Sequence, residues 1–212
     1  MLSDDRETDG TFGRTWPLEP GVRGAAVFSR CGAYRPYLRR RWGAGGMVMW
    51  LCMNPSAASD RRDDATSRKL TRHSRRLGFG GLFLLNVMDF RATDPARLPA
   101  GRERSAGNLR HISRCARLCD RLVIACGGLR GKARWLSCAM EALDACGDVP
   151  MLCVAVNGDG APRHPRVFRG DFVLRPFRRA RWPSVAAPSS AQSAKDALPG
   201  APPTWGRMSG GG

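Results

Sequence analysis

The sequence predicts an α/β fold, a three-layer α/β/α sandwich with a four-stranded, mainly parallel sheet. Four apolar runs are continuous rather than alternating, which is typical of strands buried on both faces in a parallel sheet covered by helices. Segments with helical periodicity lie between these runs and supply the crossovers that parallel strands require. The length of 212 residues fits one domain of ordinary size with tails.

The predicted strands are defined by the positions of the apolar runs. They lie at 47–53, 82–88, 121–126 and 151–156. Upstream of them, the segments AAVFSR and YLRRRW predict a hairpin at the edge of the sheet.

The predicted helices follow from the spacing of apolar side chains between the strands. In the first segment, Thr66, Leu70, His73 and Leu77 recur at spacings of four, three and four. Gly78 follows and is a natural helix stop. The same pattern predicts a second helix from Leu109, Ile112, Ala116 and Cys119, and a third from Leu136, Met140, Leu143 and Cys146.

Composition predicts one domain between two tails. Residues 1–24 lack any period and contain Gly and Pro, so we expect a flexible N-terminal arm. Residues 25–178 form the single α/β domain. Residues 179–212 are rich in Pro, Ser, Ala and Gly, which predicts a disordered tail.

The charge balance predicts a polyanionic partner. The chain holds 35 Lys and Arg against 18 Asp and Glu, a net charge of +17, which is the usual footprint of a protein that binds nucleic acid or another polyanion. We expect a nucleic acid or a nucleotide as the partner. Only three of the basic residues are lysines, so codon bias of a GC-rich genome is an alternative source of part of this charge. No apolar run is long enough to span a membrane, and the acidic start does not resemble a signal peptide. We therefore expect a cytoplasmic protein without a membrane partner.

The eight cysteines do not predict a metal site. No two of them form the C-x-x-C clip that zinc sites usually use. Cys115 and Cys119 are four apart on a predicted helix, and two sulfurs do not complete a ligand set. Most of the others lie in or beside apolar runs, where a cysteine behaves as a small hydrophobe. We expect neither a metal nor a cofactor.

Candidate functional residues follow the predicted strands. In open parallel sheets the ligand site lies beyond the carboxyl ends of the strands, and polar or glycine residues stand at all four ends. The candidates for catalysis are Asn54, Asp89 and His164, and those for substrate binding are Pro55, Ser56, Asn86, Gly127 and Gly128. Such a set supplies a water-orienting amide, a hydrogen-bond donor for developing negative charge and a turn that a ligand can approach.

Each of these candidates has a structural alternative. Asn54 before a proline and Asp89 after a strand are common turn formers. Asn86 inside an apolar strand must find partners, and a structural clamp on a neighbouring loop would provide them. His164 stands in a loop between Arg163 and Pro165, which favours a functional role.

The first predicted helix carries cations opposite its apolar stripe. A solvated helix face and a phosphate-binding surface are both compatible with this pattern. The candidates for phosphate binding are Arg68, Arg72, Arg75 and Arg76. The glycine-rich nucleotide-binding motifs are absent from the sequence, and Ser56 has no nucleophile elbow around it.

The stretch from about Tyr34 to Phe177 resembles the bacterial and phage family called domain of unknown function 1643. The resemblance rests on LCMNPSAASDRRDDATSRKLTRHSRRLGFGGLFLLNVMDFRATDP, with GNLRHI and PRHPRVF as later motifs. The chain departs from the family pattern at Cys126, where a tryptophan is usual, and at residues 156–158, where L-T-K is usual. The resemblance implies no activity.

The order of the signals also resembles that of the uracil-DNA glycosylase superfamily. Met53-Asn54-Pro55, Leu84-Leu85-Asn86, Gly127 and His164-Pro165 come in the same order as that superfamily's motifs. The resemblance implies hydrolysis of a base–sugar bond after the nucleotide leaves its stack. It implies that Asn54 orients water, that His164 donates to the departing base, and that Asn86 holds the base edge or the motif loop. Because one amide activates water weakly, Asp63, Asp64 and Asp89 remain alternatives for the general base.

The sequence therefore predicts a glycosylase-like hydrolase that acts on a nucleobase, nucleotide or nucleic acid. The alternative is a nucleic-acid-binding module with the same fold and no chemistry. A small-molecule phosphate hydrolase or transferase is a third interpretation, which the lack of an evident metal set disfavours.

Overall fold

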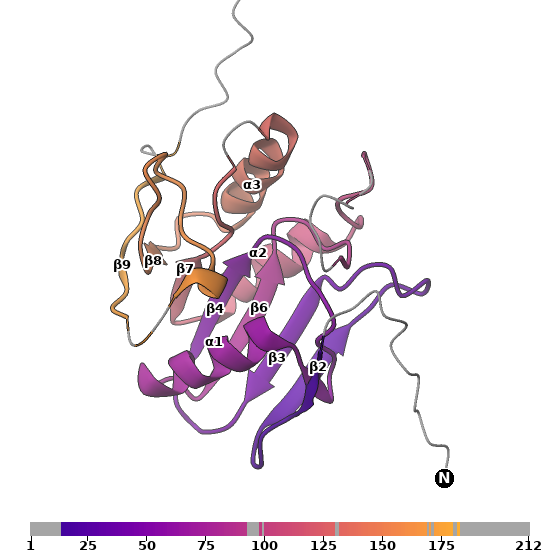
Figure 1. Cartoon of the computed structure of the whole chain (residues 1–212), viewed down its shortest axis with the longest axis vertical. Helices are drawn as coiled ribbons and strands as arrows, with labels where there is room; N and C mark the ends of the chain where they lie inside the picture. The colour runs from indigo at the N-terminus through magenta and orange to yellow at the C-terminus, as the bar shows by residue number, and fades with distance from the viewer. Residues whose placement is uncertain are drawn as a thin grey trace, which may run out of the picture.

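A computed structural model describes residues 14–92, 98, 100–129, 132–168, 170, 172–179 and 182. The described part is mixed α/β, with three α-helices and a large mixed sheet (Figure 1). The seven strands of this sheet run in the order β2-β3-β6-β4-β7-β8-β9. The sequence prediction of α/β class is confirmed.

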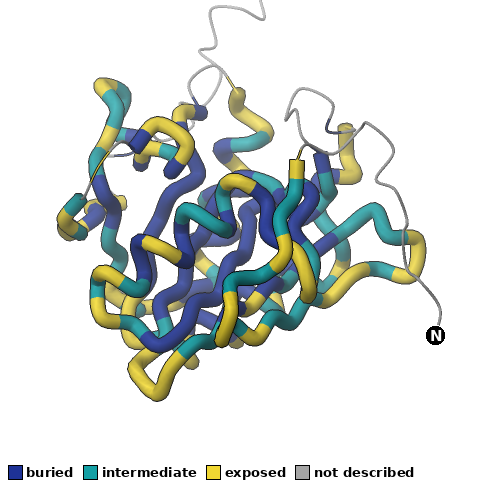
Figure 2. Tube along the Cα trace, turned by 60° about the horizontal axis from the view of Figure 1, so that its bottom comes forward, coloured by how far each residue is buried: buried dark blue, intermediate teal, exposed yellow. Residues whose placement is uncertain are grey.

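The centre of the sheet consists of the four apolar runs. These are β6 (Gly81–Asn86), β4 (Met47–Cys52), β7 (Arg121–Ile124) and β8 (Met151–Cys153), each parallel to its neighbour in this order. All six residues of β6 are buried, which explains why its sequence is apolar without alternation. In Figure 2 the buried trace runs through the middle of the molecule.

The edges of the sheet are antiparallel, and here the four-stranded, mainly parallel prediction is wrong. The expected hairpin is present as β2 (Arg23–Val27) and β3 (Tyr37–Arg41), and β3 continues the sheet onto β6. At the other edge β9 (Arg175–Pro176) pairs with β8. Three of the six strand pairs are therefore antiparallel. A two-residue strand that contains proline has no strand signal in its sequence.

Helices cover both faces of the sheet. They are α1 (Ala65–Arg76), α2 (Asn108–Leu118) and α3 (Ala133–Ala145), at the positions that the periodicity predicts. Leu70 of α1 packs with Trp50 and Leu84 on one face, whereas Ile112 of α2 and Leu136 of α3 join the cluster on the other. None of the helices in the described ranges is both long enough and apolar enough to cross a membrane.

Part of the expected N-terminal arm pairs with the segment before α1. Trp16–Pro17 forms the short strand β1, which pairs with β5 (Arg62–Asp63) just before α1. Residues 1–13 of that arm lie outside the described residues, as does the expected C-terminal tail from 183 onward.

A buried ion pair joins β3 to the segment that precedes α1. The Arg40 side chain is inaccessible to solvent, and its Nε donates to Asp63 Oδ1 at 2.9 Å. Its Nη2 donates to the carbonyl oxygens of Ser59 at 2.7 Å and Arg62 at 2.9 Å. One guanidinium thus holds a carboxylate and two carbonyl oxygens of the segment before α1 in place.

Replacing this guanidinium tests its importance for the fold. Arg40→Met leaves the Asp63 carboxylate buried without its partner, so we expect the free energy of unfolding to fall by about 3–5 kcal/mol. Arg39→Met on the same strand removes an exposed side chain and should change it by less than about 0.5 kcal/mol. Urea unfolding followed by circular dichroism measures both. Equal midpoints for the two variants would contradict the assignment.

Candidate functional site

A cavity of about 550 Å³ opens at the carboxyl ends of the central strands. Cys52, Asn86 and Cys126 line it from the ends of β4, β6 and β7. The start of α1 and the 3₁₀ helix η2 (Pro165–Val167) supply further lining residues. The register Cys52↔Asn86 between the parallel strands β4 and β6 brings these ends to one level. The cavity lies where the sequence analysis places a ligand site.

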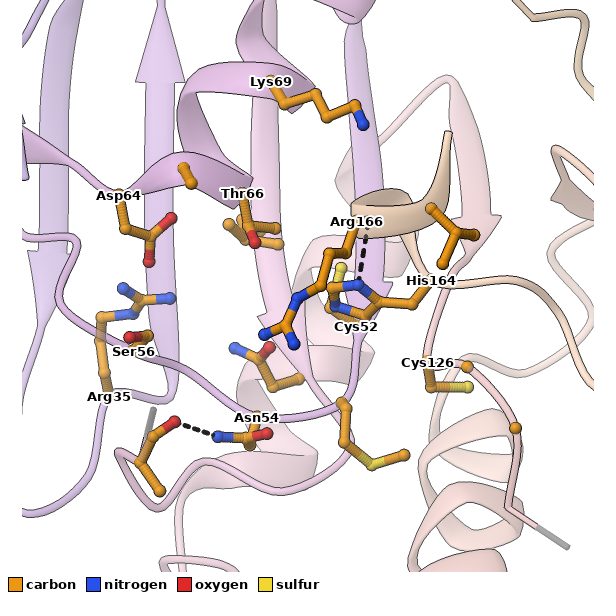
Figure 3. A pocket seen from close by; sticks show the side chains of 18 of the residues that line it. Arg35, Cys52, Asn54, Ser56, Asp64, Thr66, Lys69, Cys126, His164 and Arg166 are labelled. Carbon is orange, nitrogen blue, oxygen red and sulfur yellow. Dashed lines mark hydrogen bonds between the residues drawn. The ribbon is translucent and has the colours of Figure 1, made fainter. Parts of the chain in front are cut away.

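Six of the predicted residues line this cavity together. They are Asn54, Ser56, Asn86, Gly127, Gly128 and His164. Figure 3 shows Asn54, Ser56 and His164 around the same space, contributed by segments more than a hundred residues apart in sequence.

Two of the predicted catalytic and substrate-binding residues do not line the cavity. Asp89 is fully buried, and its carboxylate accepts from the backbone N of Ser105 at 2.6 Å and from the Ser105 hydroxyl at 2.5 Å. Pro55 is buried and its carbonyl accepts from the backbone N of Ala92 at 2.9 Å. Both residues thus stabilise the loops beside the cavity.

The four arginines predicted to bind phosphate do not line the cavity either. Arg68 lies over the ring of Trp16, 5.2 Å from its centroid, and Trp16 lines the cavity. Arg75 pairs with Glu19 at 2.8 Å, and Arg72 is exposed. Arg76 lines a separate hollow on α1 with His73, Leu77 and Phe172.

His164 is a neutral hydrogen-bond donor in this cavity. Its Nδ1 accepts from the backbone N of Arg166 at 3.1 Å, which assigns the proton of the neutral ring to Nε2. Burial lowers the pKa of His164 from 6.5 to about 4, and the positive charges of Arg166 and Lys69 act in the same direction. Gly127 at φ 88° lets the chain pass His164, because a Cβ there would lie 3.3 Å from the His164 Cβ.

The two asparagines differ in how they are held. Asn54 donates from Nδ2 to the carbonyl oxygens of Ala92 at 2.6 Å and Pro55 at 3.3 Å, so its amide clamps the loop while lining the cavity. Asn86 is only 1% exposed, and its Nδ2 has no hydrogen-bond partner among the described residues. A buried amide without a partner costs free energy, which a ligand acceptor would recover.

Sequence reasoning missed Arg35. Its side chain is 1% exposed, lines the cavity and donates from Nη1 to the carbonyl of Ala58 at 2.7 Å. Its Nε has no partner in the described part of the chain, and burial lowers the pKa of Arg35 to about 10. Arg35 precedes a predicted strand rather than following one, so its position is not one where strand ends predict a ligand site.

The start of α1 also faces the cavity. Asp64 is the N-cap of the helix, and its Oδ1 accepts from the backbone N of Ser67 at 2.8 Å while its Oδ2 accepts from the backbone N of Ala58 at 3.3 Å. Ala65 and Thr66 of the first turn line the cavity beside it. The D-D-A-T-S run carries this capping signal in the sequence.

The electrostatics of the cavity favour an anion. One acidic residue, Asp64, lines it together with five basic residues, which are Arg14, Arg35, Lys69, Lys132 and Arg166. Burial raises the pKa of the Cys52 thiol, and that of Cys126 to about 12, so neither thiol adds negative charge at neutral pH. No group of three or more His, Cys, Asp or Glu residues within the described ranges is arranged to hold a metal ion.

The low pKa of His164 predicts how stability changes with pH. Because the unfolded chain binds this proton with the ordinary pKa of 6.5, the contribution is complete above pH 6.5 and is lost as the pH falls through about 4. The free energy of unfolding should drop by about 3 kcal/mol over this range from this group. His164→Asn keeps an acceptor for the Arg166 N–H and cannot be protonated in this range. The stability difference between wild type and variant, from urea unfolding at several pH values, should therefore shrink below pH 6; a constant difference would contradict the prediction.

Comparison with known proteins identifies one family. Its sequence model, described as protein of unknown function (DUF1643), matches residues 35–166, which include the cavity-lining residues from Arg35 to Arg166. Neither the curated proteins nor the solved structures contain a match to this chain, and the resemblance to the uracil-DNA glycosylase superfamily is not confirmed. The chain belongs to the DUF1643 family.

Proposed function

We propose that this chain hydrolyses the base–sugar bond of a nucleotide or of a nucleotide unit in nucleic acid. The observation that carries the proposal is a neutral imidazole, His164, in one cavity with the buried and unpartnered amide of Asn86, among basic side chains. Two uncharged donors suit the edge of a base, and the surrounding cations suit the phosphates attached to it.

In the proposed reaction, His164 and Asn86 donate hydrogen bonds to the leaving base. When the C–N bond breaks, the electron pair leaves with the base nitrogen, and negative charge spreads onto the ring oxygens or nitrogens. His164 Nε2–H and Asn86 Nδ2–H donate to that charge, and hydrogen bonds of this kind are strongest where water is excluded. The departed base then takes a proton from solvent.

The attacking water requires a base, and the contacts of the three candidate carboxylates favour one. Asp63 is bound to Arg40 and Asp89 to Ser105, whereas Asp64 lines the cavity. Asp64 and His164 flank the cavity from opposite sides (Figure 3). Asp64 takes a proton from the water as its oxygen bonds to the sugar carbon, and Asn54 Oδ1 orients that water.

The alternative is a nucleic-acid-binding module without chemistry. It is favoured by the cations outside the cavity, such as Arg68 over Trp16 and the exposed Arg72. This reading predicts affinity that falls steeply with salt and persists in His164→Ala, whereas Arg72→Glu combined with Arg75→Glu removes it.

Release of free base tests the proposal. The protein is incubated with nucleoside monophosphates and with single- and double-stranded DNA and RNA, and released bases are separated by chromatography. We expect base release by the wild type and a loss of about 10²–10³-fold in His164→Ala, because a donor to the developing charge is removed.

His111→Ala is the matched control. His111 lies beside Tyr37, with ring centroids 5.9 Å apart, and does not line the cavity, so its replacement should leave base release unchanged. Circular dichroism checks that both variants are folded. Base release that is equal in wild type and His164→Ala would overturn the proposed roles, and salt-sensitive binding without any release would support the module instead.

A further inference from the structure

The cavity contains groups that the proposed bond breaking and water activation do not use. Ala65 and Thr66 belong to the first turn of a twelve-residue helix, whose free backbone N–H groups and dipole favour an anion. Figure 3 shows the Thr66 hydroxyl turned into the cavity. A helix start alone does not define an anion site. The guanidinium groups of Arg35 and Arg166 line the same cavity and are independent evidence for one.

Arg35 is the first of these groups. It is a buried cation whose one side-chain hydrogen bond among the described residues goes to the carbonyl of Ala58, and its Nε has no partner there. Asp64 lies beside it in Figure 3, but no ion pair within 4.0 Å joins the two. Since Asp64 already accepts from two backbone N–H groups, the guanidinium of Arg35 keeps donors for another acceptor.

Arg166 is the second group. It extends from η2 into the space between Asn54 and Thr66, opposite Arg35 (Figure 3). Its backbone N–H holds His164, so the residue that fixes the imidazole also directs a cation into the same cavity. Two guanidinium groups and a helix start that converge on one space match the several oxygens of a tetrahedral dianion better than a single carboxylate.

We infer that the cavity contains a subsite for a phosphate monoester, formed by Arg35, Arg166 and the first turn of α1. The inference rests on the proposed function and names its substrate class: a nucleotide with a terminal monophosphate, whether free or at the end of a strand. A dianionic phosphate there meets the buried guanidinium of Arg35, whose Nε has no partner among the described residues, and the exposed guanidinium of Arg166. A cavity of about 550 Å³ is within the usual range for small-molecule sites.

Binding measurements test the subsite without requiring turnover. The probes are inorganic phosphate, the common nucleosides and their 5′-monophosphates, and dinucleotides with and without a 5′-phosphate, all studied by isothermal titration calorimetry with the whole chain. We expect each 5′-monophosphate to bind at least about tenfold more tightly than its nucleoside, and inorganic phosphate to compete with it. Tighter binding of the phosphorylated dinucleotide than of the free monophosphate would identify strand ends as the source.

Two variants and one control make the test specific. Arg166→Gln should weaken 5′-monophosphate binding by about tenfold while leaving nucleoside binding unchanged. Arg163→Gln removes an exposed arginine three residues away that does not line the cavity, and it should bind like wild type. Arg35→Gln should weaken 5′-monophosphate binding as Arg166→Gln does. Arg35 also donates to the Ala58 carbonyl, so Arg35→Gln can fail to fold. In that event the result for Arg166→Gln alone tests the subsite.

The outcomes separate this inference from the proposed hydrolysis. Equal affinity for nucleosides and monophosphates, or equal loss in Arg163→Gln and Arg166→Gln, would overturn the subsite even if base release is observed. Phosphate-dependent binding that Arg166→Gln weakens would support the subsite even if no base is released from any probe.

Discussion

The parallel pairing of β4 with both β6 and β7 is the constraint on which the cavity depends. Because parallel strands end on the same side, the residues at and after those ends must share one edge of the sheet. Nearly every group discussed for the site enters from this edge, and the first turn of α1 meets it directly after the β4 end and β5. A change in register would move these side chains apart together.

The parts of the site that the sequence predicts are those that follow strong strand signals. Asn54, Asn86 and His164 each lie at or after an apolar run, so strand recognition was sufficient to bring them together. Asp89 follows the same rule and yet turns away, because Ser105 satisfies its carboxylate and no sequence pattern specifies that partner. A position directly after a strand therefore predicts the sheet edge at which a residue lies. It does not predict the direction of the side chain.

The edge of the sheet and the cationic wall were harder to predict for related reasons. In β3 the buried Arg40 interrupts the apolar alternation, and its burial is compensated by the distant Asp63 carboxylate and by the carbonyl oxygens of Ser59 and Arg62. Arg35 is buried by the same segment and contacts Ala58, more than twenty residues away. Long-range polar contacts of this kind leave no periodic signal in the sequence. Charged residues are therefore assigned to the surface even where the fold buries them.

The unequal lengths of the central strands give the cavity two walls of different stiffness. β4 and β6 are six residues long and pair along their whole length, whereas β8 has three residues and pairs with β7 at two positions. Segments with few paired residues open locally at lower free energy than the core strands. The chain that leaves β8 carries His164 and is held by backbone bonds such as Gly127 N–H to Pro162. We expect local opening at β8 to displace the imidazole side before it reaches β4 and β6. We therefore expect the wall where β4, β6 and α1 meet to select ligands by their shape.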